Sequence, residues 1–247
     1  MALDDYQDIE PNSSISSPND VIDAKDIIQD KIEFKKFFVD MGFPSRTLWA
    51  RYNLGVNPYK GLFTPESYYG DYYCWGEIET KPQYRPIDYK FATEESTSTF
   101  TKYNGELNDK DNLDLCDDAA YNNNPYTKFN IDICLPSSEQ ILELMSQTDR
   151  KLICNYKGIA GLNVVVLKSI YNNEELVFPL GGYKKERKIE AAGEFGVIMS
   201  NHMNKEYRYR SYGLRFMVKY TPNIHVDFGY EGITKYTGLN VRPVIMK

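Results

Sequence analysis

The chain of 247 residues has little of what common enzyme signatures require. It contains only two histidines, His202 and His225, and neither lies in an H-E-x-x-H zinc motif. There is no G-x-S-x-G nucleophile elbow, no glycine-rich phosphate loop ending in Gly-Lys, and no dinucleotide-binding fingerprint. We therefore expect a protein that is not an enzyme, without catalytic residues, bound metal or cofactor.

Cysteines are few and membrane-length apolar runs are missing. The four cysteines, Cys74, Cys116, Cys134 and Cys154, form no C-x-x-C pair. The first residues lack the basic and apolar regions of a signal peptide, and no apolar stretch approaches the length of a membrane span. We expect a chain made in a reducing cytoplasm, with free thiols and no membrane contact.

The chain also lacks a strongly basic region, and its negative charge is concentrated in one segment. Residues 1–33 hold nine acidic and two basic side chains, a net charge of −7, whereas the whole chain carries −6. Residues 34–247 therefore carry about +1, which is too weak a basic field to predict binding to nucleic acid.

The acidic segment is predicted to be an arm that ends in a short helix. Residues 1–16 are polar and serine-rich, which is typical of an extended segment. Ser17 and Pro18 suit a helix start, and Val21, Ala24, Ile28 and Ile32 then recur at helical spacing. Such a helix is marginal alone in water, so we expect it to dock on its own domain, a twin chain or another protein.

From Phe34 onward the sequence changes to short strands and turns, which predicts one domain over residues 34–247. Ten segments are β-branched or aromatic and bounded by Gly, Pro or Asn: Lys36–Asp40, Leu48–Asn53, Tyr72–Trp75, Leu152–Tyr156, Asn163–Ser169, Leu176–Pro179, Gly196–Ser200, Tyr207–Val218, Ile224–Phe228 and Val241–Ile245. Ser137 and Gln140 form a capping box at the start of a helix, and a second short helix is expected over Leu113–Tyr121. Long loops are expected over 55–70, 78–112 and 200–206, and no repeat is found.

Eight motifs follow one another along residues 36–246. They are Val39-Asp40-Met41-Gly42-Phe43-Pro44-Ser45, Leu48-Trp49-Ala50 with Asn53-Leu54-Gly55, Tyr69-Gly70-Asp71-Tyr72-Tyr73-Cys74-Trp75-Gly76-Glu77, Asp117-Asp118-Ala119-Ala120, Leu135-Pro136-Ser137, Phe178-Pro179-Leu180-Gly181-Gly182-Tyr183, Gly196 with Met199-Ser200, and Tyr236-Thr237-Gly238-Leu239-Asn240-Val241-Arg242-Pro243-Val244. In this order they resemble the Fibrobacter succinogenes major paralogous domain.

The resemblance implies an α+β, C-type-lectin-like fold, with mixed sheets, one or two short helices and long loops. Formylglycine-generating enzymes and some phage receptor-binding proteins share this architecture. The resemblance further implies that the first and last strands of the domain pair. Two segments depart from the family: Asn130–Cys134 lacks its usual Trp and Arg, and Met199-Ser200 replaces Ser-Ser, so local packing is expected to differ there.

Most residues of these motifs are predicted to be structural. Trp49 and Trp75 lie in strand-like segments and are expected in the core. Arg242 is expected to pair with an acid such as Asp40 across the contact between the first and last strands. The glycines of the motifs are expected to supply turns or close backbone approaches, namely Gly42, Gly55, Gly70 and Gly76.

Three segments suggest ligands but have simpler interpretations. The acidic run Asp109–Asp114 suggests calcium, yet Leu113 occupies a ligand position, so a solvated loop is the favoured interpretation. Glu10-Pro11-Asn12 matches a sugar-specificity triplet of calcium-dependent lectins but lies in the arm, so we interpret it as a coincidence. Tyr207–Tyr212 alternates Tyr and Arg, which indicates either a sugar-binding strand face or a strand with Tyr inward and Arg in water.

The leading functional hypothesis is a bacteriophage virion structural protein: a head-fibre, collar or tail-fibre component. Residues 1–33 would attach it to capsid or tail proteins or to a twin chain in a homo-oligomer, and the lectin-like domain would be displayed for attachment to host-surface carbohydrate. Such a protein is made in the host cytoplasm and located in the virion. The alternatives are a bacterial cell-surface adhesin or glycan-binding protein and, third, an enzyme of the formylglycine-generating type.

Overall fold

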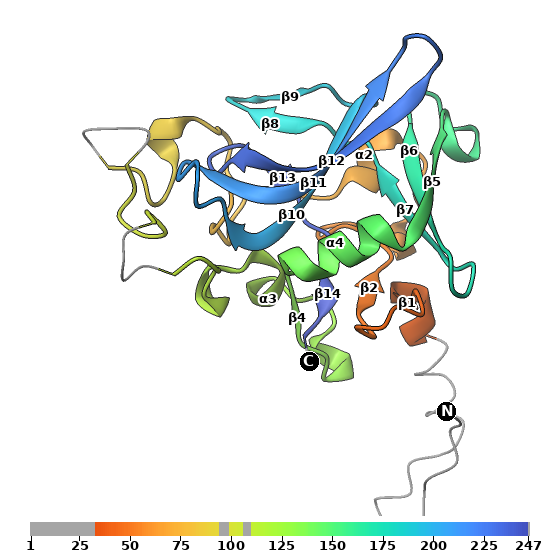
Figure 1. Ribbon diagram of the computed structural model, residues 1–247, viewed down its shortest axis with the longest axis horizontal. Coiled ribbons are helices and arrows are strands. Elements are labelled where there is room, and N and C mark those ends of the chain that lie inside the picture. Colours follow the sequence, from red (N-terminus) through yellow and green to blue (C-terminus); the bar gives the residue numbers. More distant parts are fainter. Residues whose placement is uncertain (1–32, 94–98, 106–109, 247) are drawn as a thin grey trace, which may run out of the picture.

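A computed structural model describes residues 33–93, 99–105 and 110–246 of the chain (Figure 1). Short strands in several small sheets dominate, and the helices are few and short, so the predicted α+β class is confirmed. The strand pairs of the described part are all antiparallel, whereas mixed sheets were expected. The predicted arm and helix over residues 1–32 and the Glu10-Pro11-Asn12 triplet lie outside the described residues.

A four-stranded sheet brings together both ends of the domain. Its order is β1 (Phe38–Asp40), β2 (Leu48–Ala50), β14 (Val244–Ile245) and β4 (Ile133–Cys134). The first and last strands do not pair, because β2 lies between them and Trp49 is opposite both Val39 and Val244. The strand expected from Lys36 begins two residues later, since residues 33–37 are helical.

Two three-stranded sheets form most of the remaining body. One has the order β10 (Phe195–Met203), β11 (Arg210–Lys219) and β12 (His225–Thr234). The other has the order β5 (Thr148–Ile153), β6 (Val164–Ser169) and β7 (Glu175–Pro179). Two smaller pairs join β3 (Tyr72–Tyr73) to β13 (Leu239–Asn240) and β8 (Tyr183–Lys185) to β9 (Lys188–Glu190). Strands β4, β8, β9 and β13 were not predicted.

The predicted helix after Ser137 is confirmed as α4 (Ser138–Ser146). The Ser137 hydroxyl accepts from the Gln140 backbone N–H, and the Gln140 side chain accepts from the Ser137 N–H. The helix expected over 113–121 is instead two short pieces, the 3₁₀ turn η3 (Leu115–Asp117) and α3 (Ala119–Asn122). The described parts of the predicted loops contain three short helical segments, η1 (Pro58–Lys60), α2 (Pro65–Tyr69) and η2 (Pro86–Asp88). Two more 3₁₀ turns lie outside the predicted loops, η4 (Thr127–Phe129) and η5 (Tyr156–Gly158).

The sheet β10–β12 lies between two hydrophobic cores. Ile198, Leu214 and Phe216 face the core that holds Trp49 and the apolar side of α4, and α4 lies between this sheet and the four-stranded sheet (Figure 1). Val197 and Met199 face the other core, which contains Trp75. Both tryptophans are at most 1% exposed, so their predicted place in the core is confirmed.

The four glycines predicted to supply turns all have positive φ. Gly55 and Gly70 show why no other residue fits. A Cβ on Gly55 would lie 2.3 Å from Asp71 Oδ2, and one on Gly70 would lie 2.4 Å from the Leu54 carbonyl oxygen. These glycines let the loop after β2 approach β3 closely.

Asp118 connects two of the sequence motifs. One carboxylate oxygen accepts from the N–H groups of Ala120 and Tyr121 and so caps α3, at 2.8 and 3.2 Å. The other oxygen accepts from the Leu135 N–H at 2.8 Å. The Asp-Asp-Ala-Ala motif therefore positions the chain just before the Leu-Pro-Ser motif that begins α4.

Arg242 does not pair with Asp40, so that prediction is wrong. The guanidinium is fully buried and donates to Asn53 Oδ1 (2.9 Å) and to the carbonyls of Ala50 (3.0 Å), Arg51 (2.8 Å) and Val177 (2.9 Å). The guanidinium carbon, Cζ, lies 4.4 Å from the centre of the Phe178 ring. Asp40 is exposed and accepts from the Gly42 N–H at 2.8 Å. The role of Arg242 is structural, but its partners are backbone carbonyls and one amide rather than a carboxylate.

Replacement of Arg242 by Met is expected to lower the free energy of unfolding by about 3–5 kcal/mol, because several buried acceptors lose their donor. Asp40→Asn is the matched control and is expected to change it by less than about 0.5 kcal/mol. Urea unfolding followed by tryptophan fluorescence measures both. Equal losses in the two variants would instead support a pair between Asp40 and Arg242.

Candidate functional site

Several aromatic side chains line a cleft of about 400 Å³, which we call the aromatic cleft. It is formed by the end of the first helical segment, the loop after β2, the start of β3 and the chain between α3 and η4. Its aromatic walls are Phe37, Tyr59, Tyr73, Tyr126 and Phe129.

Phe37 lies at the centre of these rings. Its ring centre is 5.3 Å from that of Tyr126, 5.6 Å from Tyr59 and 6.1 Å from Phe129, at tilted or edge-on angles. Aromatic pairs prefer such offset and edge-on geometries. Tyr59 is held at the rim because Asn57 Oδ1 accepts from its N–H and Pro58 begins η1, and the side chain is 61% exposed.

Polar groups are interspersed with the rings of the cleft. The exposed Asp71 carboxylate lies against Gly55, and Lys128 Nζ lies 4.4 Å from the centre of the Phe129 ring. Glu33 accepts from the Tyr59 hydroxyl at 3.2 Å and lies 3.5 Å from Lys128 Nζ. Burial raises the pKa of Tyr126 to about 12, so this hydroxyl stays protonated and can donate. The cleft thus combines aromatic faces with a small number of polar groups, an arrangement typical of ligand-binding sites.

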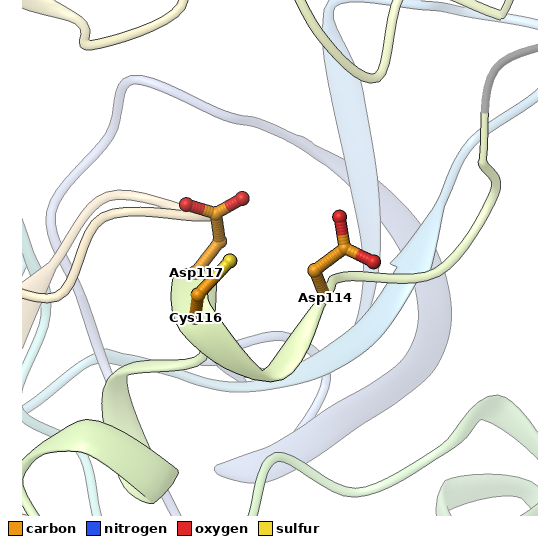
Figure 2. A group of neighbouring side chains, drawn as sticks. All are labelled: Asp114, Cys116 and Asp117. Carbon is orange, nitrogen blue, oxygen red and sulfur yellow. The ribbon is translucent and has the colours of Figure 1, made fainter.

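The acidic run that suggested calcium forms ion pairs with lysines. Figure 2 shows Asp114, Cys116 and Asp117 on one turn of the chain, with their ligand atoms within 4.8 Å of one another. Lys102 Nζ lies 2.7 Å from Asp114 and 2.5 Å from Asp117. Lys90 is 2.7 Å from Asp117, and Lys110 also pairs with Asp114. Asp109 lies outside the described residues.

These ammonium groups supply the positive charge that a calcium ion would supply. Hydrogen bonds from Lys102 and Lys110 lower the pKa of Asp114 to about 2. Burial alone would raise the pKa of Asp117, but hydrogen bonds from Lys102, Lys90 and Tyr103 lower it. The cluster is therefore a salt-bridge network that holds neighbouring loops together.

The Tyr207–Tyr212 segment does not alternate as predicted, because β11 begins only at Arg210. The Arg210 guanidinium carbon lies 5.3 Å from the Tyr207 ring centre and 5.2 Å from that of Tyr209, so Tyr and Arg stack together. Tyr212 stacks on Tyr230 of β12 at 4.9 Å. Over its whole length, the segment therefore forms neither a sugar-binding strand face nor a strand with Tyr inward and Arg in water.

Both histidines and all four cysteines lie within the described residues. His202 Nδ1 lies 2.5 Å from Asn112 Oδ1, an amide rather than a carboxylate, and His225 is exposed at the start of β12. The thiols are all free, as predicted. Burial raises the pKa of Cys134 to about 12 and that of Cys74 further, which disfavours a reactive thiolate at either position.

The aromatic cleft was not predicted from the sequence. Its rings come from segments up to about 90 residues apart. Phe37 and Tyr73 were expected in strands and Tyr59 in a loop, whereas no element was predicted for Tyr126 and Phe129. The one available signal was Tyr59 and Phe129 standing among polar, Asn- and Pro-containing segments, since an aromatic ring in a polar loop often marks a binding surface.

The lysine network predicts a particular dependence of stability on pH. Because the folded-state pKa of Asp114 lies below its ordinary value near 4, its contribution is present above about pH 4 and is lost as the pH falls towards 2. Asp114→Asn is expected to flatten this fall, whereas Asp149→Asn, an exposed residue of β5, should leave it unchanged. Urea midpoints measured between pH 2 and 7 test this, and an unchanged slope in Asp114→Asn would contradict the assignment.

Within the described residues, no helix is long and apolar enough to cross a membrane. Comparisons of the chain with protein-family models, with curated proteins and with solved structures found no match.

Proposed function

We propose that the chain is a non-enzymatic display protein of a bacteriophage virion, with a C-type-lectin-like body that binds carbohydrate in the aromatic cleft. The eight ordered motifs support the lectin-like fold, and so does the mostly antiparallel α+β architecture that joins both domain ends in one sheet. The observation that carries the binding function is the cleft itself: five aromatic rings around a hollow of about 400 Å³.

The chemistry of the cleft suits a sugar. The C–H faces of a sugar ring pack on aromatic rings, while its hydroxyls need directional polar partners. Asp71 offers an acceptor beside the Tyr73 ring, and Lys128 offers a donor above the Phe129 ring. A neutral or weakly polar glycan satisfies both requirements at once.

Residues 1–33 are the proposed attachment to the particle. Their net charge of −7 favours a basic partner surface on a capsid or tail protein. Glu33 already contacts Tyr59 and Lys128, so the arm joins the body at the rim of the cleft. In a homo-oligomer, this placement would gather the clefts near the common point of attachment.

The proposed anchoring predicts that deletion of residues 1–33 abolishes incorporation into particles while the domain still folds. Residues 34–247 contain the strands and both hydrophobic cores described above, so the truncated chain should keep its circular dichroism spectrum. Immunoblots of purified particles measure incorporation. Normal incorporation of the folded, truncated chain would contradict the arm as anchor and favour the adhesin alternative.

The cleft predicts a loss of glycan binding on truncation of its rings. Tyr59→Ala and Phe129→Ala are each expected to weaken binding to host-surface polysaccharide about tenfold or more, because aromatic anchors in hollows dominate recognition. Phe63→Ala is the matched control, since Phe63 is 81% exposed and does not line the cleft. Biolayer interferometry on purified polysaccharide measures the effect. Equal losses in all three variants, or none, would argue against this cleft.

The enzyme alternative has less support. Nothing in the cleft lining is a ready nucleophile, and Cys74 donates to the Tyr236 carbonyl at 3.2 Å in the interior.

A further inference from the structure

A second, smaller hollow of about 170 Å³ lies where the chain after β2 meets β7. Its walls come from Arg51 and Tyr52, from Tyr68 of α2, from Tyr156 and Lys157 of η5, and from the buried Arg242. We call it the basic pocket. It shares no lining residue with the aromatic cleft.

The charge of the basic pocket is unbalanced. Three cations line it, Arg51, Lys157 and Arg242, against one acid, Glu175. Arg51 also lies 3.4 Å from Glu174, but both side chains of that pair are substantially exposed, so the interaction is weak. The lining therefore carries a net positive charge in a domain whose total charge is close to zero.

Arg242 is the buried cation of this lining. Four of its five N–H groups donate to neutral oxygens, and no carboxylate within the described residues contacts the guanidinium. Nη2 carries a second N–H besides the one that donates to Val177, and Arg242 is among the residues that line the pocket. A buried cation without a counter-ion is unfavourable, and an anion in the pocket would relieve this cost.

Tyrosine rings form part of the remaining walls, beside the aliphatic side chains of Leu176, Val177 and Pro179. The Tyr68 and Tyr156 rings meet edge to face at 6.2 Å, and Lys157 Nζ lies 5.4 Å from the Tyr156 ring centre and 6.0 Å from that of Tyr68. Lys157 has a left-handed backbone, with φ of 54° and ψ of 26°. Such a conformation is uncommon for a residue with a side chain and recurs at binding sites. With this backbone conformation, the Lys157 ammonium group lies over the Tyr68 and Tyr156 rings at the pocket.

We propose that the basic pocket binds the carboxylate of an acidic sugar, such as a uronic or sialic acid residue. The carboxylate would accept from Arg242 and pair with Lys157 and Arg51, while the sugar ring packs on Tyr68 and Tyr156. The aromatic walls favour a sugar acid over inorganic phosphate, which has no C–H surface to pack on rings. This inference rests on the proposed glycan-binding function. It adds that the bound glycan contains an acidic sugar.

Titration of the full-length protein with glucuronate, glucose and inorganic phosphate, followed by NMR chemical shifts of the Tyr156 and Val177 amides, tests the proposal. Glucuronate is expected to shift both amides with saturation, whereas glucose at equal concentration should not. Lys157→Ala is expected to weaken glucuronate binding about fivefold, and added salt should weaken it further. Lys168→Ala, an exposed lysine of β6 outside the pocket, is the matched control.

Three outcomes would overturn the proposal: equal binding of glucose and glucuronate, tighter binding of phosphate than of glucuronate, or unchanged binding in both Lys157→Ala and the double variant Lys157→Ala with Arg51→Ala. The double variant Lys157→Ala with Arg51→Ala covers the case in which one cation replaces the other. Loss of polysaccharide binding in Tyr59→Ala with intact glucuronate shifts would separate the aromatic cleft from this pocket, so the two proposals can fail independently.

Discussion

The buried Arg242 guanidinium is the interaction on which the arrangement of the domain depends most. It binds the backbone at the end of β2, at Ala50 and the following residue Arg51. It also binds Val177 in β7 and packs on the Phe178 ring. The four-stranded sheet and the β5–β7 sheet are thereby fixed to each other and to the C-terminal segment. The planar, multiply donating head of arginine suits this position, because lysine offers a single point charge.

Burial has an electrostatic consequence for this residue. Desolvation lowers the pKa of Arg242 to about 9, so the group stays charged at neutral pH. Neutral carbonyls satisfy its hydrogen bonds without cancelling its charge. The same arginine that fixes the sheets thus leaves positive potential in the wall of the basic pocket, and structure and proposed recognition arise from one side chain.

The abundance of tyrosine has a structural explanation of the same kind. Three buried hydroxyls donate to backbone carbonyls: Tyr72 to Gly181 at 2.6 Å, Tyr84 to Tyr72 at 2.5 Å and Tyr89 to Trp75 at 2.7 Å. Because much of the core is built from loops and two-residue strands, many carbonyls lack a partner in a sheet. Tyrosine fills the core with a ring and supplies the missing donor.

The two proposed sites differ in the charge they would recognise. The aromatic cleft combines rings with one acid and one base, whereas the basic pocket combines rings with an excess of cations. The acidic cluster at Asp114 and Asp117 is different again, because lysines already satisfy its carboxylates. A hollow beside the charged groups, rather than charge alone, distinguishes the two candidate sites from this internal salt-bridge network.

Local sequence signals determined the parts of the fold that local chemistry controls. The capping box of α4, the positive-φ glycines, the buried tryptophans and the strand β6 followed from residue type and spacing. Strand β10 was predicted only in part, because it continues to Met203 in a segment expected to be a loop. The two-residue strands β4 and β13 and the three-residue strands β8 and β9 were missed, because so few residues show no periodicity and form strands only when a partner lies beside them.

Only the tertiary structure decided which segments meet. It placed β2 between the first and last strands, and it gave Arg242 carbonyl partners in place of Asp40. It also gathered the rings of the aromatic cleft and the cations of the basic pocket from distant loops. Contacts of this kind depend on how loops close over long sequence separations, and no local pattern of residues encodes that closure.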